Sequence, residues 1–533
     1  MGDPGKTRAK NRSTMHLVLL HGYLLTGTGS NIYVANVARA WAAQGHAVTV
    51  VCQEPEAASL AFVNEAFFPG DDPPKEPPAD GRLRVVVPDI GGLLPVYVLD
   101  RYEGYEVKCI PDMTPEEVER HIALTARALR QAARKAHRVL ANHVLLGPVI
   151  ARRALAGTGV PYDVKLHGSA IEFTLVPTPR LMPYAVEGLG SAERIYAGTR
   201  YVRDRVLEVF DAEREDLGLD EKVHVVSPGM DPTVFMLSED PAASERRALV
   251  SIATKIRRNG RGRRAGAGVK PGKHTDRELH EFLVSAGETY DQRTPDADLL
   301  ERWPELRPDE PVIGYLGKLL DTKGVGELLV TFPKVAERIP QSRLLIIGFG
   351  AYREHLEGMV QSLQHGDLDA FTRYARAGGF VEELDFRPWF RPLGKRGRDR
   401  ITLTGMLDHD CLRDTLPLCS LLTVPSKWPE AFGMVAVEAM AAGVLPLCNY
   451  HAGLKDVVDE VATVAPELAE LMKLDRSRFV HELPDRICGA LEFLYPKSFA
   501  EHEHRLNVAK TLRKIAVERF SWDGIAVRLL NPT

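Results

Sequence analysis

Short apolar runs, each followed by a glycine-containing turn or an amphipathic segment, recur along the chain. This alternation is typical of doubly wound α/β domains, whose buried parallel strands are nearly continuous apolar runs. Amphipathic helices are expected at residues 31–44 and 114–137. We expect strands at 16–20, 47–52, 83–87, 139–140, 162–166, 195–197 and 223–226 in the first half, and at 311–316, 344–347, 401–404, 421–424 and 445–447 in the second.

The pattern stops between residues 236 and 310 and then restarts, which divides the chain into two domains. The intervening run 255–264 is rich in Arg, Lys and Gly, and such a run is most often a solvated, mobile loop. We therefore expect a disordered N-terminus at 1–14, a Rossmann-like domain at 15–235, a basic, variable insertion at 236–310, a second Rossmann-like domain at 311–495, and a terminal helix at about 496–533 that packs back on the first domain.

The stretch 424–443 combines a strand end, a loop and a helix start with two carboxylates. The apolar run ends at Pro425, and a helix opens near Gly433 and ends at Gly443, a residue typical of helix C-termini. The free N–H groups and positive dipole end of such a helix suit a diphosphate. Glu430 in the loop and Glu438 in the helix are acceptors for sugar or ribose hydroxyls. The combination indicates a nucleotide-sugar site.

Candidate groups also follow the strands of the first half. The glycine-rich turn 27–29 lets backbone N–H groups approach a phosphate or sugar, although glycine at such a turn also serves geometry alone. A dinucleotide fingerprint is not completed there, which disfavours a hydride-transfer enzyme. His167 stands at the carboxyl end of a strand, where open α/β sheets bind ligands, with a buried structural histidine as the alternative. Asn142 and His143 lie at the same edge and are either packed residues or acceptor contacts.

In the second half, a strand runs into Gly317 and Lys318, and Lys323 precedes the next helix. Two cations near one strand end are well placed to stabilise a diphosphate leaving group; the alternative is a pair of surface lysines. Neither Asp71-Asp72 nor the D-x-D sequence 408–410 lies in a convincing metal-binding context, so we expect metal-independent chemistry.

The frame of Pro425-Ser426, Glu430, seven intervening residues, Glu438 and Gly443 resembles the donor-site motif of retaining GT-B glycosyltransferases, most closely glycosyltransferase family 4. The resemblance covers about 15–235 and 311–460. It implies two facing Rossmann-like domains with the active site in the cleft between them. It also implies transfer of a hexosyl unit, with retention, from a UDP- or GDP-linked sugar to an acceptor hydroxyl.

The resemblance also assigns roles. Glu430 would hold donor-sugar hydroxyls, Glu438 the ribose diol, and His167 the sugar from the other domain. The family usually has Arg at Lys318, and Gly-Gly at His451-Ala452, so this chain departs from the pattern at both places. The implied sets are His167, Lys318, Lys323 and Glu430 for catalysis; Gly27, Thr28, Gly29, Gly317, Gly405, Met406, Leu407, Phe432, Gly433, Met434 and Glu438 for the nucleotide sugar, with the base against 405–407; and Asn142 and His143 for the acceptor.

Composition narrows the functional class without identifying a substrate. The 533 residues carry 68 basic and 72 acidic side chains, a net charge of −4 that gives no reason to expect nucleic acid. The six cysteines form no C-x-x-C pair, which favours reduced thiols. We find neither a signal peptide nor a membrane-length apolar run, and expect a cytoplasmic protein. The basic runs at 255–264 and 391–400, the latter with Lys395, Arg396 and Arg398, are solvated loops or contacts for an anionic acceptor or the inner membrane face.

Two rival functions remain open at this stage. A nucleotide-sugar epimerase shares the two-domain architecture but needs acid/base carboxylates and histidines distributed around its cleft. A catalytically inactive nucleotide-sugar-binding relative is disfavoured because the five matched elements, from the 27–29 turn to Glu438, are all present.

Overall fold

The computed structural model describes residues 14–27, 29–72, 74–97, 104–264, 272, 274–307, 309–380, 385–394 and 400–532. The chain divides into two compact units: Met1–Gly229 together with Trp522–Thr533, and Met230–Ser521. The expectations for residues 1–13, Thr28 and 395–399 lie outside the described residues.

The first unit is built on an eight-stranded sheet in the order β10-β9-β8-β7-β1-β2-β4-β3, with every strand pair parallel. Its strands are β1 (His16–Leu20), β2 (Ala47–Val51), β3 (Glu65–Phe67), β4 (Leu83–Val86), β7 (Arg138–Asn142), β8 (Tyr162–Lys165), β9 (Arg194–Ala197) and β10 (Val223–Val225). A separate parallel pair consists of β5 (Leu93–Val96) and β6 (Glu106–Cys109).

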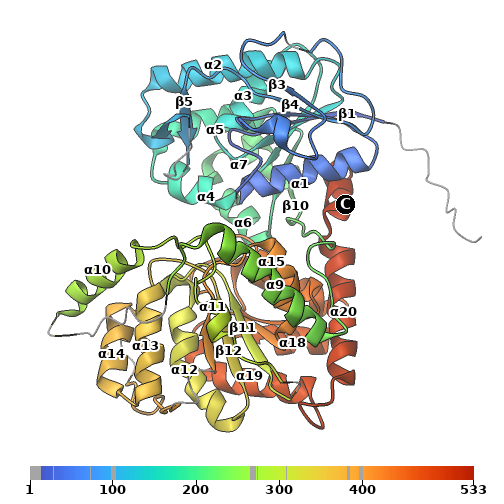
Figure 1. The fold of residues 1–533 in the computed structure, drawn as a ribbon. Coiled ribbons are helices and arrows are strands. Elements are labelled where there is room, and N and C mark those ends of the chain that lie inside the picture. The colour runs from blue at the N-terminus through green and yellow to red at the C-terminus, as the bar shows by residue number, and fades with distance from the viewer. Residues whose placement is uncertain are drawn as a thin grey trace, which may run out of the picture. The chain divides into compact units, whose positions relative to one another are not determined.

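Helices cover both faces of this sheet because its strands are apolar on both sides. Leu17 and Leu19 of β1 pack with helices α1 (Ser30–Ala43) and α21 (Trp522–Leu530), whereas Val18 and Leu20 pack in the core that contains α2 (Pro115–Ala132), α3 (Leu146–Leu155) and α5 (Met182–Gly190). The remaining helices are α4 (Gly168–Ala170), α6 (Arg200–Val209), α7 (Arg214–Leu217) and α8 (Leu219–Lys222). Successive side chains of each apolar strand point to opposite faces of the sheet. Helices therefore pack on both faces and form the doubly wound layers visible in Figure 1.

The second unit has a six-stranded parallel sheet in the order β13-β12-β11-β14-β15-β16. Its strands are β11 (Val312–Leu316), β12 (Arg343–Ile347), β13 (Ile401–Leu403), β14 (Leu421–Val424), β15 (Leu445–Asn449) and β16 (Lys473–Leu474). Its helices after β11 are α12 (Val325–Arg338), α13 (Arg353–His365), α14 (Leu368–Ala377), α15 (His409–Thr415), α16 (Met434–Ala441), α17 (Ala452–Ala462), α18 (Pro466–Met472), α19 (Phe479–Leu494) and α20 (Glu503–Phe520).

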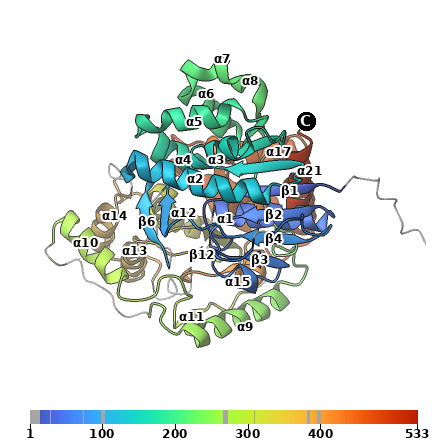
Figure 2. The same cartoon turned by 90° about the horizontal axis from the view of Figure 1, so that it is seen from above.

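The segment 236–310 is integrated into the second unit. The expectation of a solvated loop at 255–264 is only partly right, because the run is helical up to Asn259 and Arg263 is buried, whereas 260, 261 and 264 are exposed and non-helical. The segment forms α9 (Pro241–Asn259), α10 (Asp276–Gly287) and α11 (Leu299–Arg302). Ile252, Leu283 and Leu299, one from each helix, lie in the core of the second unit. Helix α10 lies beside α13 and α14 in both views (Figures 1 and 2). An apolar stripe at helical spacing accounts for the packing of α9.

The C-terminal segment is divided between the two units. Helix α20 packs on α16 and α19 within the second unit, and the chain turns at Ser521. Only α21 joins the first unit, where the Trp41 indole N–H donates to Ala526 O at 3.0 Å. The expected terminal helix is therefore two helices, of which one packs on the first unit. Within the described ranges, no helix is both long enough and apolar enough to cross a membrane.

Candidate functional site

Glu430 is held in the loop between β14 and α16 by partners from two elements. Its Oε1 accepts from Lys323 Nζ at 2.5 Å and from Ser426 Oγ at 2.7 Å, and its backbone carbonyl accepts from Gly453 N at 2.9 Å. Both side-chain contacts use Oε1. The other carboxylate oxygen, Oε2, is therefore left to accept a hydrogen bond from a ligand. The carboxylate is thus oriented before any ligand arrives.

The loop itself is fixed by contacts that the sequence did not reveal. Asn449 Nδ2 donates to Pro425 O and Ser426 O at 3.0 and 3.1 Å, and His451 Nε2 lies 2.8 Å from Ser426 O. At Gly324, with φ of 70°, an added Cβ would lie 2.1 Å from Pro425 O. His451, a departure from the family pattern, therefore supports the loop. The sequence signal was a polar residue at the end of the buried strand β15.

The two lysines expected to act alike have different surroundings. Lys323 is ion-paired to Glu430, and its side chain is 29% exposed. Lys318 is exposed at the end of β11, and its ammonium group has no ion pair with any described residue. Gly317 donates its N–H to Ile347 O at 3.1 Å and so ties this strand end to its neighbour. Lys318 thus supplies free positive charge, whereas the charge of Lys323 is shared with a carboxylate.

Glu438 is a half-buried carboxylate on α16 without a hydrogen-bond or ion-pair partner among the described residues. Burial raises its pKa from 4.5 to about 7. The helix opens at Gly433, where φ is 104° and an added Cβ would lie 2.4 Å from Leu454. The first turn of a helix leaves N–H groups without intrahelical acceptors, so Gly433 and Met434 lie at an anion-favouring end. A partly buried carboxylate without a protein partner is unfavourable by itself, which indicates a ligand-binding role.

Other predicted donor-site residues turn out to be packed or engaged. Phe432 is buried against Phe520, and Leu407 is also buried. Gly405 has φ of 75°, and its carbonyl accepts from Gly348 N at 3.0 Å. The Met406 N–H donates to Thr294 O at 3.2 Å. The backbone donor of Met406 is therefore already used within the protein.

In the first unit, the ends of β7 and β8 bring His167 and Asn142 together. Asn142 Nδ2 donates to Leu20 O at 3.1 Å, so its Oδ1 is the acceptor for His167 Nε2 at 3.0 Å. His167 Nδ1 is consequently the unprotonated nitrogen. Burial, followed by the charges of Lys165 and His21, holds the pKa of His167 well below its usual range. His167 is a neutral hydrogen-bond acceptor, and Asn142 orients it.

His143 lies in an unusual environment beside this pair. It has φ of 71°, is buried, and stacks on Tyr97 with ring centroids 4.4 Å apart. It lines a cavity of about 30 Å³ with His21, His121 and Thr125. Among the described residues, both nitrogens of His143, the Nδ1 atoms of His21 and His121, and Thr125 Oγ1 have no hydrogen-bond partner. Burial lowers the pKa of all three histidines.

Gly27 and Gly29 both have positive φ, 98° and 60°, as a tight turn requires, and Gly29 precedes α1. In the part of the chain that the structure describes, no group of three or more His, Cys, Asp or Glu side chains is arranged to hold a metal ion.

Two family models match the chain. The glycosyl transferase 4-like domain matches residues 28–229, and glycosyl transferases group 1 matches residues 310–473. Together they cover more than half of the 533 residues.

Curated relatives align over parts of their length. A GDP-mannose-dependent α-(1-6)-phosphatidylinositol monomannoside mannosyltransferase of Mycolicibacterium smegmatis is 34% identical over 170 residues, 32% of this chain and 38% of the relative. A lipopolysaccharide 1,2-N-acetylglucosaminetransferase of Salmonella typhimurium is 27% identical over 241 residues, 45% and 52% of the two chains. The chain spans about half the length of the first curated relatives it matches.

Solved structures resemble the chain over nearly its whole length. A glycosyltransferase from Rickettsia africae is 12% identical with a TM-score of 0.53, over 97% of both chains. Anabaena Alr3699/HepE, solved in complex with UDP and glucose, is 13% identical with a TM-score of 0.51, over 97% of this chain and 98% of that one. At these identities the similarity concerns the fold.

Proposed function

The chain belongs to the group 1, family-4-like glycosyltransferases with the GT-B fold, and we propose that it moves a hexosyl unit from a UDP- or GDP-linked sugar to an acceptor hydroxyl with retention. The observation that carries the proposal is the donor half-site of the second unit. There an oriented Glu430 and a partnerless Glu438 accompany the N-terminal end of α16 and the exposed Lys318.

Each group of this half-site has chemistry that fits a nucleotide sugar. Glu438 accepts from the ribose diol, because a carboxylate without a protein donor gains most from two hydroxyl donors. Lys318 and the N-terminal end of α16 face the diphosphate. Glu430 keeps Oε2 for sugar hydroxyls, and its negative charge stabilises the oxocarbenium-like centre that forms as the donor bond breaks.

The proposed transfer occurs on one face of the donor sugar. The bond from the anomeric carbon to the diphosphate oxygen breaks as the acceptor oxygen bonds to that carbon, and the acceptor proton goes to the departing phosphate oxygen. Lys318 stabilises the charge that develops on the diphosphate, with Lys323 shared between it and Glu430. No protein nucleophile or metal ion takes part in the proposed step.

The first unit supplies the acceptor side in this proposal. Its imidazoles are neutral, so they suit hydroxyl groups better than an anion. The unpartnered nitrogens of His143 can donate to or accept from such groups, whereas the unprotonated Nδ1 of His167 accepts from a hydroxyl of the donor sugar, which His167 orients. The small cavity beside His143 has room for water or for the tip of a hydroxyl-bearing group.

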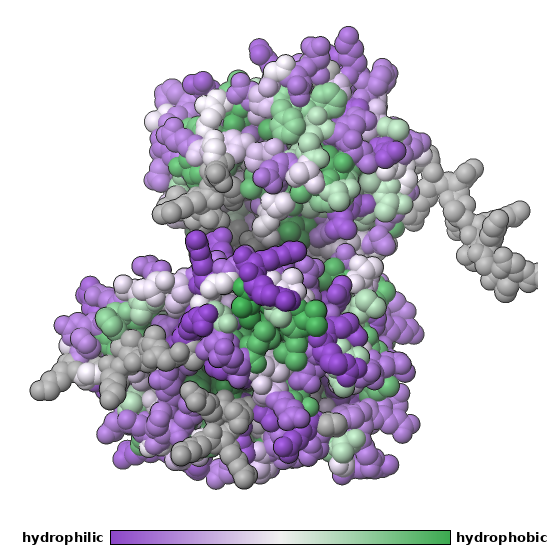
Figure 3. Space-filling model, in the orientation of Figure 1, coloured by the Kyte–Doolittle hydropathy of each residue, from purple (hydrophilic) through white to green (hydrophobic). Residues whose placement is uncertain are grey.

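A peripheral contact with an anionic membrane is part of the same proposal, supported by the outward face of α9. Arg246, Arg257 and Arg258 are exposed there and have no ion pair with a described residue, and Val250 is 66% exposed between them. On the face shown in Figure 3, apolar atoms gather over α9 and hydrophilic side chains border them. Arginines around an apolar patch suit an anionic lipid surface.

The test is product formation with a panel of UDP- and GDP-sugars and simple hydroxyl acceptors, with anomeric configuration assigned by NMR. A glycoside with the configuration of the donor supports the proposal. An epimerised nucleotide sugar without transfer supports the epimerase instead. Binding without either product supports the inactive relative, and the inverted anomer refutes the proposed stereochemistry.

A further inference from the structure

Residues 290–296, which precede α11, lie against the end of the edge strand β13. Asp296 N donates to Thr404 O at 2.8 Å and Met406 N to Thr294 O at 3.2 Å, and Pro295 forms an antiparallel bridge with Gly405. A Cβ added at Gly405 would lie only 2.7 to 2.8 Å from Thr294 O and from two atoms of Asp296. The segment therefore extends the sheet edge and requires glycine at 405.

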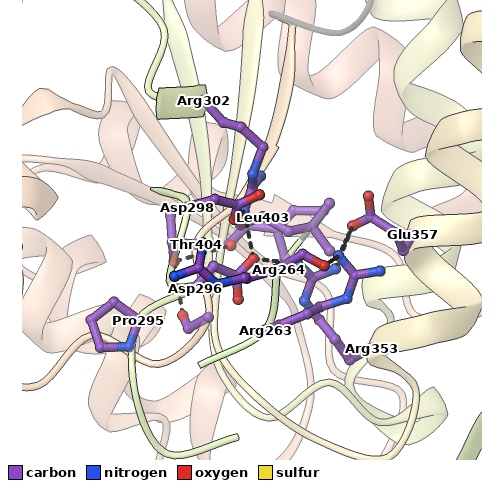
Figure 4. A network of polar contacts seen from close by, with 12 residues as sticks. Arg263, Arg264, Pro295, Asp296, Asp298, Arg302, Arg353, Glu357, Leu403 and Thr404 are labelled. Carbon is purple, nitrogen blue, oxygen red and sulfur yellow. Dashed lines mark hydrogen bonds and ion pairs between the residues drawn. The ribbon is translucent and has the colours of Figure 1, made fainter. Parts of the chain in front are cut away.

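Buried ion pairs fix this segment to α13 (Figure 4). Asp296 Oδ2 accepts from Arg302 Nη2 at 2.7 Å and from Arg353 Nη2 at 2.6 Å. Arg353 also binds Glu357 at 2.7 Å. Arg263, which is 2% exposed, binds both carboxylate oxygens of Glu354 at 2.6 and 2.9 Å. The segment is thus part of the rigid scaffold of the second unit.

Between this segment and the sheet lies a shallow hollow. Its lining includes Tyr290, Asp291 and Gln292 on one side and the turn 348–350 and Gly405, which follow β12 and β13, on the other. It is open to solvent, and its enclosed part is small, about 10 Å³. The turns at the strand ends are linked in sheet order, because Leu319 N donates to Phe349 O at 2.8 Å and Gly348 N to Gly405 O at 3.0 Å. A nucleotide whose diphosphate lies near Lys318 would extend along these turns toward the hollow.

On the side of the hollow formed by residues 290–292, the side chains offer hydrogen-bond acceptors. Asp291 is exposed; its Oδ1 accepts from Arg293 N at 2.9 Å, and no described cation pairs with the carboxylate. Gln292 Nε2 donates to Gly287 O at 2.6 Å, which directs its amide oxygen elsewhere. The Tyr290 hydroxyl donates to Glu354. The N–H of Met406 is also used. Arg353, a buried residue of the same lining, directs Nη1 to Glu357 and Nη2 to Asp296, and its Nε has no hydrogen-bond partner among the described residues.

We propose that Tyr290, Asp291 and Gln292 form the base-selecting wall of the donor site, and that Asp291 makes this site prefer guanine over uracil. Guanine presents two adjacent donors, N1–H and the N2 amino group, to one carboxylate. Uracil presents a single N–H between two carbonyl oxygens, which a carboxylate repels. The inference rests on the proposed function and narrows its donor to a guanosine diphosphate sugar.

The test compares GDP and UDP binding to the full chain by calorimetry, for the natural protein, Asp291→Asn and the control Glu288→Gln. Asn keeps Oδ1 for the Arg293 N–H, so the turn is retained. Glu288 is an exposed acid two residues before the segment and does not line the hollow. The natural protein and the control should bind GDP about tenfold more tightly than UDP, and Asp291→Asn should remove most of this difference.

Tighter binding of UDP by the natural protein, or a GDP-to-UDP ratio unchanged in Asp291→Asn, overturns the inference and leaves the proposed glycosyl transfer intact. Binding of neither nucleotide, together with no product from any donor, overturns the proposed function and this inference with it.

Discussion

Glu438 should release a proton when the protein binds a nucleotide sugar. In the free protein, burial raises the pKa of Glu438 from 4.5 to about 7. This shift disfavours the ionised carboxylate by about 3 kcal/mol, since one pKa unit corresponds to about 1.4 kcal/mol. Two ribose hydroxyls donating to the carboxylate favour its ionised form and return the pKa toward its ordinary value. Binding and deprotonation are therefore linked.

The magnitude follows from the two pKa values. At pH 6.5 a group with a pKa near 7 is about three-quarters protonated, so binding should release about 0.7 proton, and affinity should rise about tenfold between pH 6 and pH 8. Calorimetry in two buffers with different ionisation enthalpies measures the release. A nucleotide sugar is the suitable ligand, because its diphosphate is esterified at both ends and does not titrate near neutrality.

Glu438→Gln is the matched control, since it keeps the shape and cannot ionise. Its binding heat should not depend on the buffer, and its affinity should be weaker and flat with pH. Because the folded pKa is raised, the natural protein loses stability as pH rises from about 4.5 through about 7, and Glu438→Gln should escape this loss of up to about 3 kcal/mol. Buffer-independent heat for the natural protein at pH 6.5 would refute the ribose contact.

Three further changes test other parts of the molecule. Glu430→Gln should lower kcat at least a hundredfold while nucleotide affinity changes little, because the lost charge acts on the transition state; unchanged turnover would remove Glu430 from the mechanism. Arg263→Ala should lower the free energy of unfolding by about 3–5 kcal/mol in urea titrations, since Glu354 loses its buried bidentate partner; a loss below 1 kcal/mol would contradict this. Arg246→Glu combined with Arg258→Glu should weaken sedimentation with anionic lipid vesicles at least tenfold without affecting neutral vesicles; equal binding would exclude this face of α9.

The sheets were predictable because their strands are buried on both faces. The apolar runs at 16–20, 421–424 and 445–447 correspond to β1, β14 and β15 with little change in bounds. The short strands β3 and β5 were not predicted, because β3 lies in a Pro- and Asp-rich stretch and Pro95 lies within β5. Such edge elements depend on neighbours that no local pattern shows.

The helices of the segment 236–310 were not predicted, because its charged residues are far more conspicuous in the sequence than its weak helical periodicity. The residues that α9 buries, Ser244, Ala248 and Ile252, recur every four positions but are mostly small, so their apolar stripe is weak. Arg263 belongs to a run that looks solvated, yet its partners Glu354 and Glu357 lie about ninety residues away. A buried charge is recognisable only when its partners are known.

Contacts between residues far apart in the sequence also decide how much the Glu430–Glu438 motif can tell. The motif indicates the chemistry of the donor site but not its selectivity for a base. Glu430 and Glu438 belong to one strand–loop–helix element, so their spacing alone predicted their chemistry. Selectivity for the base depends on which groups at 405–407 remain open, and the Met406 N–H is bonded to Thr294 from outside the motif. With that donor used, side chains that the insertion carries, above all Asp291, contribute to the discrimination between bases in our proposal. We infer that residues 290–292 adapt a common transferase scaffold to its own donor.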